Sequence, residues 1–284
     1  MSYARKNKEK LPIYLWIFIT VELMIYVTYM YIDIVLSSNE ASKSGLVTTL
    51  PRSQILSDTY LKYYSIIICL LVTAVLYYKS KTKTYALIAG AMFFTAFSDY
   101  FLLLNPDRMV PGLVSFCIVH AIYLYVILGG NIKRTAVISG IRIGISIITA
   151  IVLTVTGTVR FSNDSSLSAV MFLVILYGLS FVWNIILQVP SITLSGTSQN
   201  NKKTDAASRT CLFPHPIMFL IGLFLFLLCD LNVMIYNLGS FVNINSGLYN
   251  TLRASSVVLM WAFYLPSQVL IVLSAILPVQ SGNH

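Results

Sequence analysis

The chain has 284 residues, of which 57% are apolar and only 10% are charged, and its formal net charge at pH 7 is +9. Soluble domains carry about 25% charged residues, so this composition excludes a soluble globular fold and indicates an integral membrane protein. The positive excess could suggest a nucleic-acid partner. The cations instead lie where a membrane topology would place them, and we expect no nucleic acid to bind.

Eight runs of the chain are long and apolar enough to cross a bilayer as helices. About 20 residues, each rising about 1.5 Å, span the roughly 30 Å of hydrocarbon. The runs are continuously apolar rather than alternating, which excludes a membrane β-barrel. We therefore predict an all-α fold, a polytopic membrane bundle with eight transmembrane helices that forms a single domain over residues 1–284. The predicted spans are 13–36, 60–78, 84–105, 109–129, 135–158, 166–190, 216–238 and 255–277, with longer polar connections at about 37–59 and 191–213.

The basic residues are distributed unequally between the two sides of this arrangement. Twelve of the 19 Lys and Arg residues fall on one side and six on the other, while Arg142 lies inside the fifth span. The positive-inside rule therefore predicts that both termini are cytoplasmic. The twelve are Arg5, Lys6, Lys8, Lys10, Lys79, Lys81, Lys83, Lys133, Arg134, Lys202, Lys203 and Arg209, and the six are Lys43, Arg52, Lys62, Arg108, Arg160 and Arg253.

The first apolar run follows a basic segment, as a signal sequence does. The run is too long for a signal peptide, contains Glu22 and lacks a small-residue cleavage pattern, so we expect a retained span. The protein would then reside in the cell membrane of a bacterium or in the endoplasmic reticulum membrane of a eukaryote.

Two aspartates lie near the ends of long apolar runs. Asp99 stands in FFTAFSDYFLLL and Asp230 in FLFLLCDLNVMI. An ionisable group at membrane depth costs about 2.5–3.5 kcal/mol on insertion scales, and it usually faces a partner, a water-filled cavity or a substrate. At a helical rise of about 1.5 Å per residue, both acids come to lie roughly 9–12 Å below the outer boundary. The matching depth predicts one site that contains both carboxyl groups.

A span with further polar side chains follows each aspartate. The first carries His120 and Tyr123 at helical spacing, and the second carries Tyr264 and Gln268. These four side chains come to lie roughly 14–20 Å below the same boundary. We therefore expect a shared cavity in the outer half to the middle of the bilayer, lined by Asp99, His120, Tyr123, Asp230, Tyr264 and Gln268.

Each of these residues also has a purely structural interpretation. A buried aspartate is often satisfied by a Tyr, Arg or His of a neighbouring span and holds the bundle together. His120 alone would more often be a donor between helices, the tyrosines could be packing residues, and Gln268 could join two helices. Glu22 and Arg142 could form a buried pair or contact lipid headgroups.

Four segments together resemble a known family. FSDYFLLL followed by GLVSFCIVHAIYLYVI is similar to the paired signature of the YhhN family of eight-span membrane proteins, in which an acidic helix end precedes a Gly-x-x-x-Phe…His…Tyr helix. GLFLFLLCDLNVMIYN resembles the second acidic motif of that family, and FYLPSQVLIVLSAI resembles its closing Tyr…Gln helix. The chain departs from the pattern at Ser98, where a glycine commonly precedes the first acid, and at Cys229, where a serine commonly precedes the second.

The family includes the lysoplasmalogenases. The resemblance therefore implies hydrolysis of the vinyl-ether bond of lysoplasmalogens, giving a fatty aldehyde and a glycerophospho-alcohol. It implies a lysophospholipid substrate taken from among the membrane lipids, with no cofactor and no metal ion. Asp99 and Asp230 would be the two essential acids, and His120, Tyr123, Tyr264 and Gln268 would line the substrate site.

The hydrolysis of a vinyl ether can use two carboxyl groups in different roles. One acid protonates the β-carbon, and a second carboxylate stabilises the resulting oxocarbenium ion and activates water. Burial favours the protonated form of a carboxyl group, and a second carboxyl nearby favours it further. Glycosidases use a carboxyl pair for a related oxocarbenium ion. The sequence does not say which aspartate is the acid, and His120 could orient groups or shuttle a proton.

Rival functions have less support in the sequence. A zinc-dependent hydrolase needs about three His ligands, and only His120 of the three histidines lies in a span. No Gly-x-Ser-x-Gly elbow is present for acyl hydrolysis. The alternative from another class is a proton-coupled transporter or a lipid-binding membrane protein, which would use the same acids. An enzyme consumes its lipid in detergent, whereas a transporter needs a sealed compartment.

Overall fold

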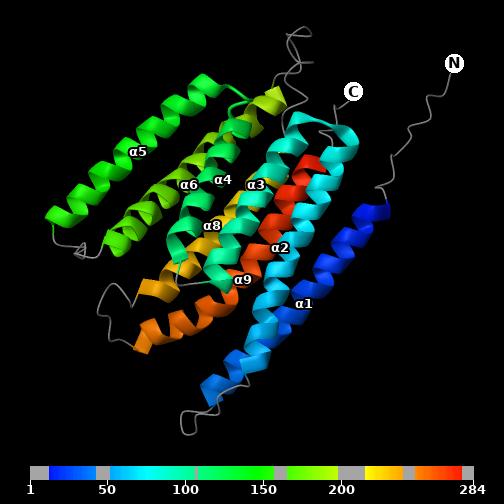
Figure 1. Ribbon diagram of the computed structural model, residues 1–284, viewed down its shortest axis with the longest axis vertical. Coiled ribbons are helices and arrows are strands. Elements are labelled where there is room, and N and C mark those ends of the chain that lie inside the picture. The colour runs from blue at the N-terminus through cyan, green and yellow to red at the C-terminus, as the bar shows by residue number, and fades with distance from the viewer. Residues whose placement is uncertain are drawn as a thin grey trace.

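The computed structural model describes residues 13–42, 52–105, 108–156, 165–197, 215–238 and 247–276 (Figure 1). Within these ranges the chain forms eight long α-helices and one π-helical segment, with no strand. Eight stretches of the described chain are long and apolar enough to cross a membrane, seven within single α-helices and one formed by α3 together with the π-helical segment, so the predicted all-α bundle of eight transmembrane helices is confirmed. The elements are α1 (Ile13–Ser42), α2 (Arg52–Ser80), α3 (Lys83–Asp99), η1 (Tyr100–Leu104), α4 (Met109–Ile127), α5 (Ile132–Val155), α6 (Ser165–Thr197), α8 (Pro216–Leu238) and α9 (Gly247–Ile276).

Several helices are longer than the predicted spans. Helix α9 begins at Gly247 rather than at residue 255. Helices α1 and α2 extend into the predicted connection 37–59, and α6 extends into the connection 191–213 as far as Thr197. Hydropathy marks only the part of a helix that suits hydrocarbon, whereas backbone hydrogen bonding continues into the more polar zone beyond it. The remaining residues of these connections lie outside the described ranges.

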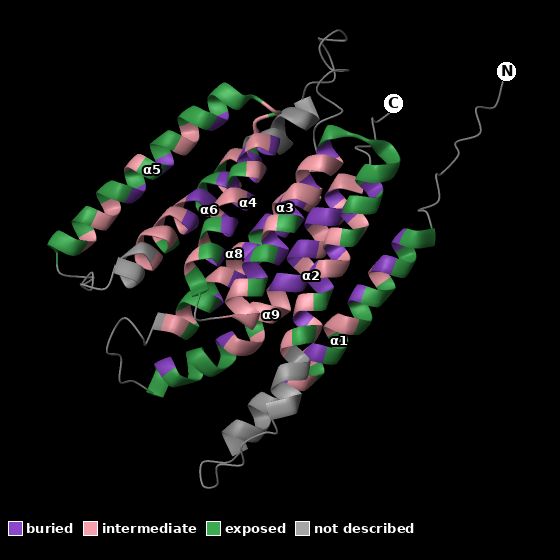
Figure 2. Ribbon diagram, viewed as in Figure 1, coloured by how far each residue is buried: buried purple, intermediate pink, exposed green. Residues whose placement is uncertain are grey.

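Helix α9 lies at the centre of the bundle, where it contacts α1, α2, α3 and α8. Helix α4 contacts α3, α5 and α6, and α6 also contacts α8. Helices α1 and α5 lie on opposite edges in the view of Figure 1. Figure 2 shows buried residues concentrated on the central helices and exposed residues along α5. Lipid chains are as apolar as leucine, so exposed apolar faces are the expected surface of a membrane bundle.

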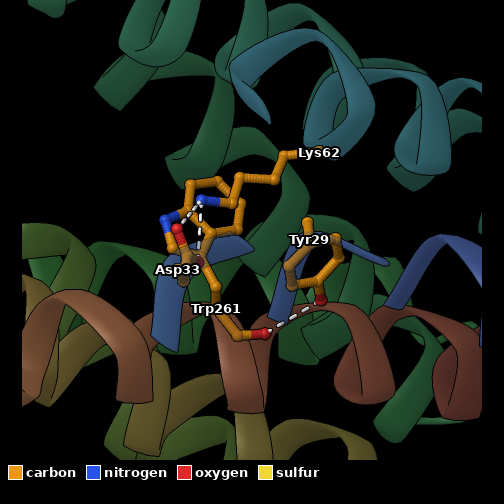
Figure 3. A network of polar contacts seen from close by, with 4 residues as sticks. All are labelled: Tyr29, Asp33, Lys62 and Trp261. Carbon is orange, nitrogen blue, oxygen red and sulfur yellow. Dashed lines mark hydrogen bonds and ion pairs between the residues drawn. The ribbon is translucent and has the colours of Figure 1, made fainter. Parts of the chain in front are cut away.

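An ion pair between α1 and α2 lies against Trp261 of α9 (Figure 3). Lys62 Nζ of α2 lies 2.9 Å from Asp33 Oδ2 of α1. The same ammonium group lies 4.6 Å from the ring centre of Trp261 and 5.6 Å from that of Tyr29. The hydroxyl of Tyr29 donates to the Trp261 carbonyl at 3.1 Å. Lys62, counted from the sequence among the outer cations, is therefore a buried side chain within α2.

Helix α9 contains Pro266. Proline has no N–H, so the carbonyl four residues earlier, that of Ala262, loses its helical donor. The hydroxyl of Tyr26 in α1 donates to this carbonyl at 3.3 Å. A neighbouring helix thus satisfies the backbone group that proline frees, which is how proline is tolerated at membrane depth.

Helices α8 and α9 pack closely against each other at Gly222. A Cβ at this position would lie 2.8 Å from Ile271 Cγ1 and 3.1 Å from the Ser267 carbonyl oxygen. Only a residue without a side chain fits there, as at other small-residue contacts between membrane helices.

We predict that Gly222→Ala lowers the midpoint of thermal unfolding of the purified protein in detergent. The added methyl group would overpack the α8–α9 contact, and overpacking costs about 1–3 kcal/mol. The matched control is Gly178→Ala in α6, where nothing lies within 4 Å of the added Cβ. This control should be neutral or slightly stabilising, and equal destabilisation by both variants would contradict the close approach.

We predict the sidedness of the connections from the charge distribution. In a Cys211→Ser background, Lys81→Cys and Lys133→Cys should react with a membrane-impermeant maleimide only after the cells are opened. Arg108→Cys should react in intact cells. All three positions are exposed in the structure. The reverse pattern would contradict the cytoplasmic termini, and equal labelling of Lys81→Cys and Arg108→Cys would contradict the crossing of α3.

Candidate functional site

Asp99 is the last residue of α3 and is only 4% exposed. The hydroxyl of Tyr264 in α9 donates to Asp99 Oδ2 at 2.5 Å. The two residues are 165 positions apart in the sequence. Since the phenol occupies one carboxyl oxygen, it fixes the orientation of the other.

The chain leaves the α-helical conformation directly after Asp99. Residues Tyr100–Leu104 form a π-helical segment, so the predicted span 84–105 is an α-helix with a π-helical end. A π-turn holds more residues than an α-turn, which changes the direction of the side chains that follow. Such turns are frequent at functional sites.

Small residues hold α4 against this π-helical segment. A Cβ on Gly112 would lie 3.0 Å from Leu102 Cγ and 3.2 Å from the Ser98 carbonyl oxygen. The Ser98 hydroxyl donates to the Gly112 carbonyl at 2.7 Å. Ser98, a departure from the family pattern, therefore fixes the end of α3 beside the first acid.

Asp230 lies on α8 and is partly buried. The hydroxyl of Tyr177 in α6 donates to Asp230 Oδ2. The two aspartates lie within electrostatic range of each other, and Cys229 lies within range of both. The structure therefore brings the two predicted acids into one region and gives each a tyrosine partner.

A buried aromatic cluster connects the two Asp–Tyr pairs. The ring centre of Phe226 lies 5.6 Å from Tyr264, 5.7 Å from Phe116 and 6.0 Å from His120. Tyr177 lies 5.5 Å from Phe116 and 4.9 Å from His120. His120 thus shares one aromatic environment with the partners of both acids.

Three of the predicted lining residues are fully buried and carry a polar atom without a hydrogen-bond partner among the described residues. These atoms are His120 Nε2, Tyr123 Oη and Gln268 Oε1. The Tyr123 hydroxyl lies near Thr95 without meeting hydrogen-bond geometry. Buried polar atoms are nearly always paired, so each of these unpaired atoms requires an explanation, and a hydrogen bond to a bound ligand is one.

The lining residues do not all contact one another. His120 and Tyr123 have ring centres 5.9 Å apart on α4. Gln268 lies one turn beyond Tyr264 on α9, and its amide nitrogen donates to the Ser267 hydroxyl at 3.3 Å. Gln268 makes no hydrogen bond to either acid in the described part of the chain.

Sequence reasoning missed Tyr177 and Asn184, both on α6. Asn184 is fully buried and contacts His120. A signal was present in the run VMFLVILYGLSFVWNIILQV, because Tyr177, Asn184 and Gln188 recur at intervals of seven and four residues. That spacing places them on one helix face, which is a polar stripe within an apolar span.

Glu22 and Arg142 are not paired with each other. Glu22 of α1 accepts hydrogen bonds from the Ser65 hydroxyl at 2.7 Å and from the Cys69 thiol at 3.7 Å. Arg142 of α5 donates to Asn184 Oδ1 at 2.7 Å. The expectation that the two charges form a pair was wrong, because each instead hydrogen-bonds to neutral groups of a neighbouring helix.

Comparison with known proteins identifies the family of the chain. Across the described ranges, no three His, Cys, Asp or Glu side chains are grouped so that they could hold a metal ion. No curated protein and no solved structure matches the chain. The family model described as the YhhN family matches residues 58–275, which include both aspartates and all the spanning helices except α1. The match covers well over half of the sequence, and the chain therefore belongs to the YhhN family.

Proposed function

We propose that the protein is a lysoplasmalogenase-like hydrolase, which cleaves the vinyl-ether bond of lysoplasmalogens within the membrane. The observation that carries this proposal is the placement of Asp99 and Asp230 in one buried region, each oriented by a tyrosine. Membership of the YhhN family supports the same reaction.

A pair of carboxyl groups that holds one proton can perform the whole reaction. The protonated carboxyl transfers its proton to the β-carbon, the alkene electrons form the new C–H bond, and an oxocarbenium ion results. Water adds to the cationic carbon and gives a proton to the other carboxylate, which yields a hemiacetal. The hemiacetal loses its hydroxyl proton as the glycerol oxygen gains one, and that C–O bond breaks. One water molecule is consumed, and the pair again holds one proton.

The two tyrosines orient the carboxyl groups for proton transfer. Each phenol donates to Oδ2 of its aspartate. We assign the second oxygen of each carboxyl to the substrate or to water. Orientation by a fixed donor matters because proton transfer requires the reacting atoms to lie within hydrogen-bond reach, about 2.6–3.2 Å.

The aromatic cluster provides an apolar environment for the oxocarbenium ion. Phe116, Phe226 and His120 are buried side chains between the two Asp–Tyr pairs. An apolar environment strengthens the attraction between a carboxylate and an oxocarbenium ion. Aromatic surface also suits the hydrocarbon chain of a single-chain lipid.

The substrate class can be tested with a panel of lysolipids. Purified protein in detergent should release fatty aldehyde from a lyso vinyl-ether lipid, detected by mass spectrometry. The matching alkyl-ether lipid should remain intact, because it has no alkene carbon to protonate, and the matching ester should release no aldehyde. If no lipid is consumed in detergent but lipid or protons move across sealed vesicles, the proton-coupled transporter is the better description.

The two acids can be tested by substitution. Asp99→Asn and Asp230→Asn should each reduce kcat by about 10²–10⁴-fold, the contribution typical of a general acid or base. The amide keeps the size of the side chain but cannot donate a carboxyl proton or carry the stabilising charge. The measurement is aldehyde release by protein that elutes normally in gel filtration.

The matched control for these variants is Glu22→Gln. Glu22 is also a buried acid within a span, but its partners are Ser65 and Cys69 of α2 rather than a tyrosine of the site. This control should retain activity. Full activity in both aspartate variants, or a loss that follows unfolding, would show that the Asp–Tyr pairs only hold the bundle together.

A further inference from the structure

A chain of hydrogen bonds runs from α5 through α6 to α4. Arg142 Nη2 donates to Asn184 Oδ1 at 2.7 Å. Asn184 Nδ2 lies 3.0 Å from the His120 carbonyl oxygen and 3.2 Å from His120 Nδ1. All three side chains are at least 95% buried, with 4% of Arg142 and none of Asn184 or His120 exposed.

The chemistry of the neighbours fixes the orientation of the Asn184 amide. A guanidinium group can only donate hydrogen bonds, so the atom that faces Arg142 must be the amide oxygen. A backbone carbonyl can only accept, so the atom that faces the His120 carbonyl must be the amide nitrogen. Amide oxygen and nitrogen are often hard to distinguish. Here both ends of the amide require the same orientation.

This orientation determines where the proton of His120 resides. The NH₂ group of Asn184 has two hydrogens, one for the His120 carbonyl and one for His120 Nδ1. Nδ1 must therefore offer its lone pair, and the proton of the neutral imidazole lies on Nε2. A proton on Nδ1 would place two donors opposite each other 3.2 Å apart. A doubly protonated ring would add a second cation beside Arg142.

The other ring nitrogen lies within the aromatic cluster of the candidate site. His120 Nε2 has no hydrogen-bond partner among the described residues. The ring is surrounded by Phe181, Tyr177 and Phe226, with centres 4.5, 4.9 and 6.0 Å away. The chain of donors thus ends in a buried N–H group for which the described residues supply no acceptor.

We propose that Arg142 and Asn184 are positioning residues that hold His120 as the neutral Nε2–H tautomer. His120 then recognises an acceptor oxygen of the lipid substrate as a hydrogen-bond donor, and it does not act as a base. An aspartate behind a histidine has the opposite effect, because it accepts from Nδ1–H and leaves Nε2 as an acceptor. The role in turnover rests on the proposed function, whereas the tautomer does not.

The tautomer can be measured by nitrogen NMR of protein labelled with [15N]histidine. The chain has only three histidines, so few signals arise. The signals of His120 are identified by their loss in His120→Gln. We expect an unprotonated Nδ1 and a protonated Nε2 in the wild-type protein in detergent. A proton on Nδ1 would overturn the proposal.

Asn184→Asp should reverse the tautomer. The carboxylate would accept from Arg142 and from His120, so Nδ1 should gain a proton and its signal should move to the position of a protonated ring nitrogen. The matched control is Gln188→Glu, one turn further along α6, where the side chain donates to the Pro216 carbonyl at 3.4 Å. This control should leave both His120 signals unchanged. An unprotonated Nδ1 in Asn184→Asp would contradict the positioning role.

Turnover provides an independent measurement. Asn184→Asp and the nearly isosteric Asn184→Leu should lower kcat/KM by about 10- to 100-fold, the loss seen when partners that orient a metal-bound histidine are removed. If wild-type His120 has the expected tautomer but no vinyl ether is cleaved, the proposed reaction is wrong and the positioning role stands. If the lipid is cleaved while Nδ1 carries the proton, the positioning role alone is wrong.

Discussion

A polar group at membrane depth finds no water and must be paired within the protein. Lipid does not drive helices together as water does, so these pairings also determine which helices meet. Tyr26 satisfies the carbonyl freed by Pro266, Lys62 pairs with Asp33, and Tyr264 pairs with Asp99. His120 Nε2, Tyr123 Oη and Gln268 Oε1 differ from these groups, because no described residue pairs with them. A ligand is one partner that these three atoms could take.

Helix α9 connects α1 and α2 to the candidate site through the contacts of Trp261. Trp261 receives the Lys62 ammonium on its ring and the Tyr29 hydroxyl on its carbonyl. Its ring centre lies 5.6 Å from that of Tyr264, which holds Asp99. Helix α1 ends before residue 58, where the family match begins, yet it contributes to the position of a residue proposed for catalysis.

The features that could be predicted from the sequence are those that depend on a single helix. Runs of apolar residues gave the eight spans, and the cost of burying a carboxyl group drew attention to Asp99 and Asp230. The partners were harder to predict, because they depend on how each helix is rotated and tilted against its neighbours. Spacing along the chain could therefore reveal the polar stripe of α6 but not the bond from Tyr177 to Asp230. Hydropathy also gives no signal for the π-helical turn after Asp99, which packs against Gly112 of another helix.

In the proposed site, the directions of the hydrogen bonds separate the residues that would transfer protons from those that would recognise the substrate. Both phenols donate their protons to carboxyl oxygens, and the chain from Arg142 supplies donors as far as His120. A neutral imidazole with its proton on Nε2 is a very weak acid, and the phenol protons already serve the aspartates. Among the described groups around the two acids, a carboxyl group is a stronger acid than an imidazole N–H or a free phenol such as that of Tyr123. A carboxyl group of Asp99 or Asp230 is therefore the group that we propose to protonate the carbon atom. In this proposal, proton transfer is assigned to the aspartates and recognition of the substrate to His120.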